Sequence, residues 1–270
     1  MKKTGCFWVF EGVSGSGKTS LLERTMLFFK NSGVLVISNE EPTVHNSFGK
    51  IIREIIERRT PPKTLIKEVE NYFDRFTEEM NRLLNSNNAD TSVIKSFCAK
   101  VLASIEKIKK GEKLLSRELQ MFYVVDRYFD LHDFILPYME KGYWVFNDRF
   151  LLSTFAYGGA YGVNIEEVYN WHLNILGHLM FLPNITFFIK VSGEIASERL
   201  FGSGKIIDIW EKKGKLQSLI DHYNSSISFI KNKATDDISN SFHFINGELD
   251  KEGVFQEVKN ILGTKFEVSD

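Results

Sequence analysis

The sequence predicts an α/β fold in which a parallel β-sheet is covered by helices on both faces. Short apolar runs of strand length alternate with longer segments whose apolar residues repeat at helical spacing. The strand-like runs are 7–10, 34–37, 143–147, 185–191 and 242–245. Because apolar residues largely fill these runs, both faces of each strand are expected to be buried, as they are in parallel sheets.

The predicted helices occupy the segments between these strands. They are residues 18–31, a helix around 51–56 that ends at 60 before two prolines, and 114–139, 165–180, 194–201, 216–231 and 254–262. Residues 63–110 hold two further amphipathic helices, joined by a polar turn at 85–90, and predict an inserted helical hairpin within a single domain spanning 1–270. The hairpin is expected either to pack on its own domain or to extend a dimer contact.

A glycine-rich segment separates the first predicted strand from the first helix. Gly12-Val13-Ser14-Gly15-Ser16-Gly17-Lys18-Thr19 fits the pattern G-x-x-x-x-G-K-[ST]. In such a P-loop the backbone N–H groups surround phosphate oxygens, the lysine reaches the outer phosphates and the threonine hydroxyl binds Mg²⁺. We therefore predict a P-loop NTPase-type fold that binds a nucleoside triphosphate. The residues expected at the phosphates are Gly12, Ser14, Gly15, Ser16, Gly17, Lys18, Thr19 and Ser20.

The composition is that of an ordinary globular protein with no excess of either charge. The 270 residues include 34 Lys and Arg against 35 Asp and Glu, which argues against a nucleic-acid partner. Cys6 and Cys98 lack the spacing of metal ligands. The apolar stretch near the N-terminus ends at Glu11, too early for a signal peptide, and no apolar run approaches the roughly 20 residues of a membrane span. A cytoplasmic protein without a membrane partner is expected.

Tyr123 and Arg127 lie four residues apart in the predicted helix 114–139 and therefore share a face. This pair suits a nucleotide, because aromatic rings stack on bases and guanidinium groups bind phosphates. It also fits a core tyrosine beside a surface arginine. These two residues alone leave both interpretations open.

Asp148 and Arg149 directly follow the predicted strand 143–147, with Ser153 close behind as a candidate substrate contact. Open α/β sheets bind their ligands beyond the carboxyl ends of the strands. An aspartate there commonly orients Mg²⁺ or its waters, and an arginine can hold a phosphoryl group. The alternative is a surface ion pair without a function.

Taken together and in this order, the motifs resemble those of the thymidylate kinase family. The matching stretches are residues 10–19, Glu41-Pro42, 122–127, 142–159, 182–191 and Glu198-Arg199. The resemblance covers most of residues 5–60 and 112–230, and its most specific part is the run 148–159. It implies phosphorylation of dTMP to dTDP with ATP and Mg²⁺.

The resemblance also implies roles at the acceptor nucleotide. Tyr123 would stack on the thymine, Arg127 would contact the acceptor nucleotide and Arg149 would hold the monophosphate. Tyr157 would pack beneath the deoxyribose and disfavour a 2′-hydroxyl, and Glu41 would lie close to the acceptor phosphate.

On the donor side, residues 201–210 would form a lid that closes over ATP. The residues with an implied catalytic role are Lys18, Asp148, Arg149, Arg199 and Lys205, and Thr19 with Asp148 would bind Mg²⁺. The family also implies a homodimer.

Several positions depart from the family pattern. Ser14 stands where the family usually has aspartate, Glu40 where an arginine commonly precedes the Glu-Pro pair, and Gly15 where some members have a catalytic arginine. The lid offers Arg199 at its start and Lys205 inside, and lysine lacks the bidentate fork of arginine. Because such an arginine contributes about 10³-fold or more to the rate, we predict a slow kinase or one with a different acceptor.

Two other functions stay open on the sequence. A deoxynucleoside kinase also has a P-loop, a Glu-Pro pair and a lid, but tends to show Glu-Arg-Ser where Asp148-Arg149 stands here. A nucleotide-binding protein with little catalysis is favoured by the departures and disfavoured by the retention of Lys18, Thr19 and Asp148.

Overall fold

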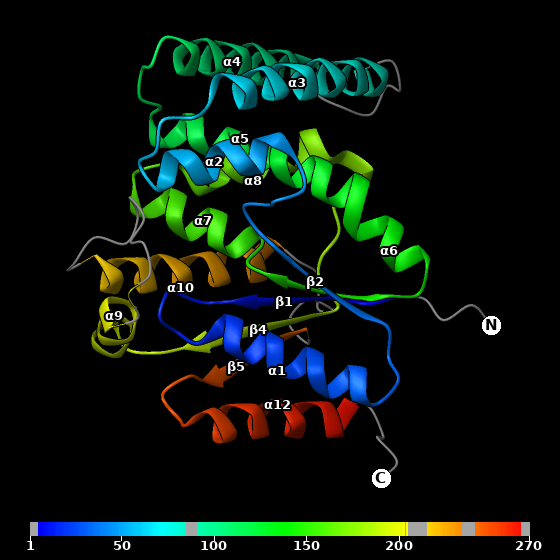
Figure 1. Ribbon diagram of the computed structural model, residues 1–270, viewed down its shortest axis with the longest axis vertical. Coiled ribbons are helices and arrows are strands. Elements are labelled where there is room, and N and C mark those ends of the chain that lie inside the picture. The colour runs from blue at the N-terminus through cyan, green and yellow to red at the C-terminus, as the bar shows by residue number, and fades with distance from the viewer. Residues whose placement is uncertain (1–4, 85–90, 203, 205–214, 234–240, 266–270) are drawn as a thin grey trace.

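A computed structural model describes residues 5–84, 91–202, 204, 215–233 and 241–265 of the chain (Figure 1). Within these residues, five parallel strands form one sheet in the order β2-β3-β1-β4-β5. The strands are β1 (Phe7–Glu11), β2 (Val36–Glu40), β3 (Trp144–Asp148), β4 (Ile185–Lys190) and β5 (Phe242–Asn246). The predicted parallel sheet flanked by helices is confirmed.

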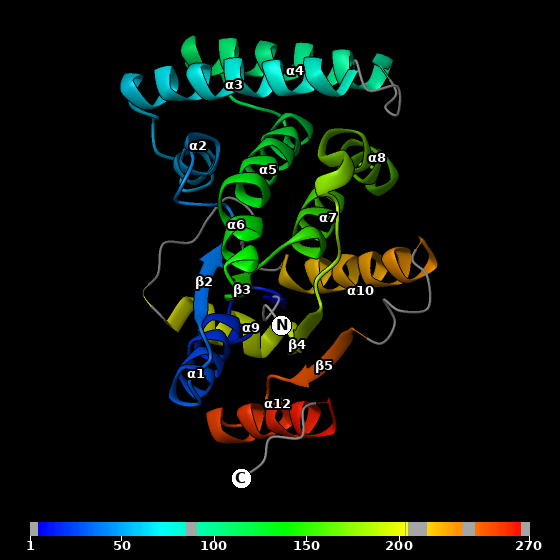
Figure 2. The ribbon, with the colours of Figure 1, turned by 90° about the vertical axis from the view of Figure 1, so that its right-hand side faces the viewer.

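Helices cover both faces of the sheet. They are α1 (Lys18–Asn31), α2 (Ser47–Ile56), α3 (Lys63–Leu84), α4 (Thr91–Lys109), α5 (Ser116–Asp130), α6 (Leu136–Glu140), α7 (Leu151–Ala160), α8 (Ile165–Leu176), α9 (Gly193–Gly202), α10 (Leu216–Lys233) and α12 (Lys251–Lys265). Helices α1 and α12 lie on one side of the sheet, and α7 and α10 lie on the other (Figures 1 and 2). In the described part of the chain, no helix is both long and apolar enough to cross a bilayer.

Alternate residues of β1 point into two different cores. Phe7 and Val9 belong to the larger core, which includes residues of α2, α5, α7, α8 and α10. Trp8 belongs to the smaller core against α1 and α12, where its ring stacks on Phe146 with centroids 4.9 Å apart. Burial on both faces fixes the central strand, and its carboxyl end therefore holds the P-loop in a defined place.

The hairpin of α3 and α4 packs on the helices of its own chain. Phe76 of α3 contacts the rings of Tyr128 and Phe129 of α5, and Phe97 of α4 contacts Trp171 of α8. The hairpin lies at the end of the molecule opposite α12 in both views (Figures 1 and 2). This is the first of the two expected arrangements, and a dimer contact stays a prediction.

Three elements differ from the expected ones. The predicted helix 114–139 is interrupted by a π-helical turn, Leu131–Ile135, because Pro137 has no N–H to donate to the preceding turn. Helix α7 was not expected; nearly all its residues are buried, so it lacks the polar face that marks a surface helix. Strand β2 begins at Val36 and continues through polar residues to Glu40. Most of the predicted lid, 201–210, lies outside the described residues.

Candidate active site

The P-loop joins the carboxyl end of β1 to the N-terminus of α1. Gly12, Gly15 and Gly17 all have positive φ angles, which residues with side chains rarely adopt. Gly17 has no side chain to cap α1, and the first turn contains no acidic residue, so the positive end of the helix dipole faces the loop without compensation. Lys18 is buried against the loop, where its Nζ donates to the Val13 carbonyl at 3.2 Å. These are the features of a phosphate-binding loop.

Gly15 lies against the backbone of α9. A Cβ atom at this position would come within 2.3 Å of the Ala196 carbonyl oxygen. We expect Gly15→Ala to push the loop from its position and to weaken ATP binding at least ~10-fold, measured as a Kd by calorimetry. Gly33→Ala is the matched control: Gly33 has a similar φ of +77°, but an added Cβ would meet no atom of the described residues within 4 Å. Equal ATP affinities of the two variants would contradict the expected steric effect.

Thr19 and Asp148 meet beside the P-loop because Asp148 pairs with Phe10 in the sheet. The Thr19 hydroxyl donates to Asp148 Oδ2 at 2.7 Å, and the buried Oδ1 of Asp148 has no hydrogen-bond partner within the part of the chain that the structure describes. A hydroxyl and a carboxylate oxygen without a partner are hard donors that suit Mg²⁺. Among the described residues, no group of three or more His, Cys, Asp or Glu side chains could hold a metal ion. Mg²⁺ binding by Thr19 and Asp148 stays a prediction.

Arg149 is held in a strained backbone conformation at the junction of the P-loop with α7. Its φ is +74°, and strain of this kind costs about 1–3 kcal/mol and gathers at functional sites. The guanidinium donates to four oxygens from the P-loop, α7 and α10. They are Gly12 O at 3.2 Å, Ser14 Oγ at 2.8 Å, Ser153 Oγ at 3.3 Å and Tyr223 Oη at 3.1 Å.

The position of α7 is fixed by Glu11, the last residue of β1. The buried Glu11 carboxylate accepts from the N–H groups of Phe150 and Ser153, at 2.8 and 3.2 Å, and from the Ser153 hydroxyl at 2.5 Å. It thereby caps the N-terminus of α7. Burial raises the pKa of Glu11. Sequence reasoning missed Glu11 and also Tyr223, whose Oη lies 2.7 Å from Ser153 Oγ.

A small pocket of about 50 Å³ lies beside Arg149. Its lining residues are Glu41, Pro42, Ile56, Gln120, Tyr123, Arg149, Ser153, Thr154 and Tyr157. The Arg149 Cζ lies 5.2 Å from the centre of the Tyr157 ring. The structure therefore brings together the residues predicted at the acceptor, from three separate segments of the chain, with the exception of Arg127.

Arg127 is fully buried behind this pocket and supports its wall. Its guanidinium forms a bidentate pair with Glu41, donates to the Thr154 hydroxyl at 2.8 Å and lies 2.5 Å from His172 Nε2. The His172 Nδ1 donates to the Val168 carbonyl at 2.7 Å, so Nε2 is the acceptor, and burial lowers the pKa of this ring. Burial raises the pKa of Glu41 to about 7, against the opposing attraction of Arg127. A direct contact of Arg127 with the acceptor stays a prediction.

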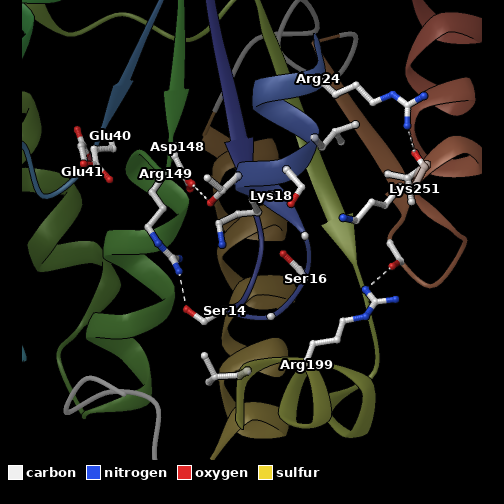
Figure 3. Close-up of a pocket in the computed structure, with 18 of the residues that line it drawn as sticks. Ser14, Ser16, Lys18, Arg24, Glu40, Glu41, Asp148, Arg149, Arg199 and Lys251 are labelled. Carbon is white, nitrogen blue, oxygen red and sulfur yellow. Dashed lines mark hydrogen bonds between the residues drawn. The ribbon is translucent and has the colours of Figure 1, made fainter. Parts of the chain in front are cut away.

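A larger cleft of about 940 Å³ runs along the P-loop and shares Glu41, Pro42, Ile56 and Arg149 with the small pocket. Ser20 lines this cleft too. Figure 3 shows Arg149 and Arg199 on opposite sides of the P-loop. Arg199 donates to the Gly247 carbonyl at 2.7 Å, near the loop that precedes α12, and its catalytic role stays a prediction. Lys205 lies outside the described residues.

Comparison with known proteins assigns this chain to a family. The sequence profile of thymidylate kinases matches residues 94–245, more than half of the chain. The chain belongs to the thymidylate kinase family. It is 30% identical over 263 residues to the thymidylate kinase of Mesoplasma florum, covering 97% of each chain. It is 27% identical over 257 residues to that of Thermosipho africanus, covering 95% of this chain and 96% of the relative.

Both alignments cover nearly the whole chain, although the P-loop lies outside the profile match. Membership of the thymidylate kinase family makes the protein a kinase that transfers a phosphoryl group between nucleotides. The predicted family is therefore confirmed. The cytoplasmic location and the homodimer stay predictions. Light scattering, which gives the mass of the particle in solution, tests the homodimer.

Proposed function

We propose that the protein transfers the γ-phosphoryl group of ATP to dTMP, giving ADP and dTDP. In this reaction a phosphate oxygen of dTMP bonds to the γ-phosphorus, and the bond from that phosphorus to the β,γ-bridging oxygen breaks. The observation that carries the proposal is a pair of neighbouring cavities. A small pocket lined by Tyr123 and Tyr157 shares Arg149 with the P-loop cleft.

The lining of the small pocket suits a nucleoside monophosphate as the acceptor. The rings of Tyr123 and Tyr157 can pack against a base and its sugar, and the Arg149 guanidinium can bind a phosphate. With the base beside Tyr123, the acceptor phosphate would reach Arg149, which lines both cavities. Phosphoryl transfer depends on such positioning and on neutralised charge more than on covalent chemistry.

Each group around the P-loop has a part in this proposal. Lys18 and the N-terminus of α1 would bind the phosphates of ATP. Mg²⁺, when bound at Thr19 and Asp148, would neutralise phosphate charge. Arg149 would hold the acceptor phosphate in line with the γ-phosphorus. The expectation of slow turnover, based on Ser14, Gly15 and the lid, stays a prediction.

A coupled ADP-release assay with ATP and Mg²⁺ tests the proposal against dTMP, dUMP, dGMP and thymidine, with Lys18→Ala as the blank. We expect release with dTMP that disappears in the Lys18→Ala variant. Release with thymidine alone would move the protein to the deoxynucleoside kinases. ATP binding without release on any acceptor would indicate a nucleotide-binding protein.

A further inference from the structure

Gln120 of α5 is a buried polar residue whose amide the described part of the chain leaves unsatisfied. Its side chain is fully buried, and among the described residues neither its amide oxygen Oε1 nor its amide nitrogen Nε2 has a hydrogen-bond partner. A buried amide in this state has given up its hydrogen bonds to water without replacing them, which destabilises the folded protein. A bound ligand with a matching donor and acceptor would supply the missing hydrogen bonds of this amide.

Gln120 is part of the wall of the acceptor pocket. Gln120 lines this pocket one helical turn before Tyr123, so the two side chains share a face of α5. On the neighbouring helix α7, a Cβ atom at Gly158 would lie 3.4 Å from the Gln120 Cδ, so α7 passes the amide without a side chain between them.

Two polar neighbours in the pocket wall are already engaged. Glu41 is paired with Arg127, and Thr154 accepts from the same guanidinium. Gln120 therefore presents an unengaged donor and an unengaged acceptor side by side, at the wall where Tyr123 would stack on a base.

A carboxamide and the edge of thymine are complementary. Thymine presents the N3–H donor next to the O4 acceptor, and an amide presents an acceptor next to a donor at matching spacing. We propose that Gln120 recognises the thymine of dTMP by a bidentate contact. Nε2 donates to O4, and Oε1 accepts from N3–H. This inference rests on the proposed function and names the residue that reads the base.

The test combines a variant with a modified substrate. Gln120→Met keeps the length of the side chain and removes both polar atoms, and N3-methyl-dTMP lacks the N3–H donor. We expect the wild type to prefer dTMP over N3-methyl-dTMP by about 10-fold or more in kcat/KM. We expect Gln120→Met to lower kcat/KM for dTMP about 10- to 100-fold, to lose most of this preference, and to leave the KM for ATP unchanged.

The melting temperature distinguishes base recognition from a purely structural role of Gln120. If Gln120 recognises the base, Gln120→Met removes only an unsatisfied buried amide, and its melting temperature without ligand should equal or exceed that of the wild type. Wild-type kinetics in Gln120→Met, or an unchanged preference between the two substrates, would overturn the inference. If the variant fails to fold, the preference of the wild type decides, and equal use of both substrates overturns the inference.

Calorimetric binding of dTMP separates this inference from the proposed reaction. Binding of dTMP without turnover would contradict the proposed function, and the loss of affinity in Gln120→Met would still support the contact. A wild type that does not bind dTMP would overturn the contact as well.

Discussion

Replacing Arg149 by alanine is expected to lower kcat/KM for dTMP by about 10³-fold, the contribution of arginines that stabilise phosphoryl transfer in other P-loop enzymes. Arg149 lines both the acceptor pocket and the P-loop cleft. Its guanidinium reaches the Gly12 carbonyl and the Ser14 hydroxyl of the P-loop, so it lies where donor and acceptor phosphates would meet. The loss should fall mainly on kcat and the KM for dTMP, measured by steady-state ADP release.

Two further variants separate the effect of the positive charge of Arg149 from that of its bidentate hydrogen bonding. Arg149→Lys keeps the charge without the bidentate fork and is expected to retain only part of the activity. Ser14→Ala removes one acceptor of Arg149 and should have a small effect. The backbone strain at φ +74° is the same for arginine and alanine, so any loss of stability comes from the lost hydrogen bonds of the guanidinium, and thermal unfolding measures it separately from the loss of activity. An Arg149→Ala enzyme with a kcat/KM close to that of the wild type would contradict the proposed role.

Local patterns in the sequence were sufficient to predict the parallel sheet and the P-loop. The apolar run of β1 and the glycines after it act within a few residues, so their pattern determines both elements. The Thr19–Asp148 contact could also be anticipated. Asp148 ends one strand, the P-loop that leads to Thr19 follows another, and the carboxyl ends of parallel strands meet at one edge of the sheet.

Contacts between distant segments were not accessible in this way. Tyr223 comes from α10 and meets Ser153 of α7, and no pattern around either residue indicates the other. The spacing of Tyr123 and Arg127 left a nucleotide contact and a structural role both open, because helix spacing gives the face of a residue and not what covers it. The Arg127 guanidinium is covered by Glu41 and His172, which lie far from Arg127 in the chain.

The burial of Arg127 leads to a second large effect, on stability. Arg127→Met is expected to lower the free energy of unfolding by about 3–5 kcal/mol, because it leaves the carboxylate of Glu41 buried without its partner. Urea denaturation at pH 8 measures the loss. The matched control is the double variant Glu41→Gln with Arg127→Met, which removes both charges and should recover part of the stability. No recovery in the double variant would show that packing, and not the unpaired charge, explains the loss.

The loss in Arg127→Met should also depend on pH in a defined direction. Burial raises the pKa of Glu41 from 4.5 to about 7, so the folded wild type binds a proton that the unfolded chain releases, and the contribution of Glu41 to stability falls as pH rises through this range. Without Arg127 the pKa of Glu41 rises further, since the attraction that lowered it is gone. At pH 8 the folded wild type has an ionised Glu41 paired with Arg127, whereas the folded variant must either keep Glu41 protonated or bury an unpaired carboxylate, and both cost free energy. At pH 6 Glu41 is protonated in both folded proteins, while burial keeps the nearby His172 uncharged at both pH values. The difference between variant and wild type should therefore be largest at pH 8 and smaller at pH 6. A difference that stays constant or grows as the pH falls would show that Glu41 does not carry the unpaired charge.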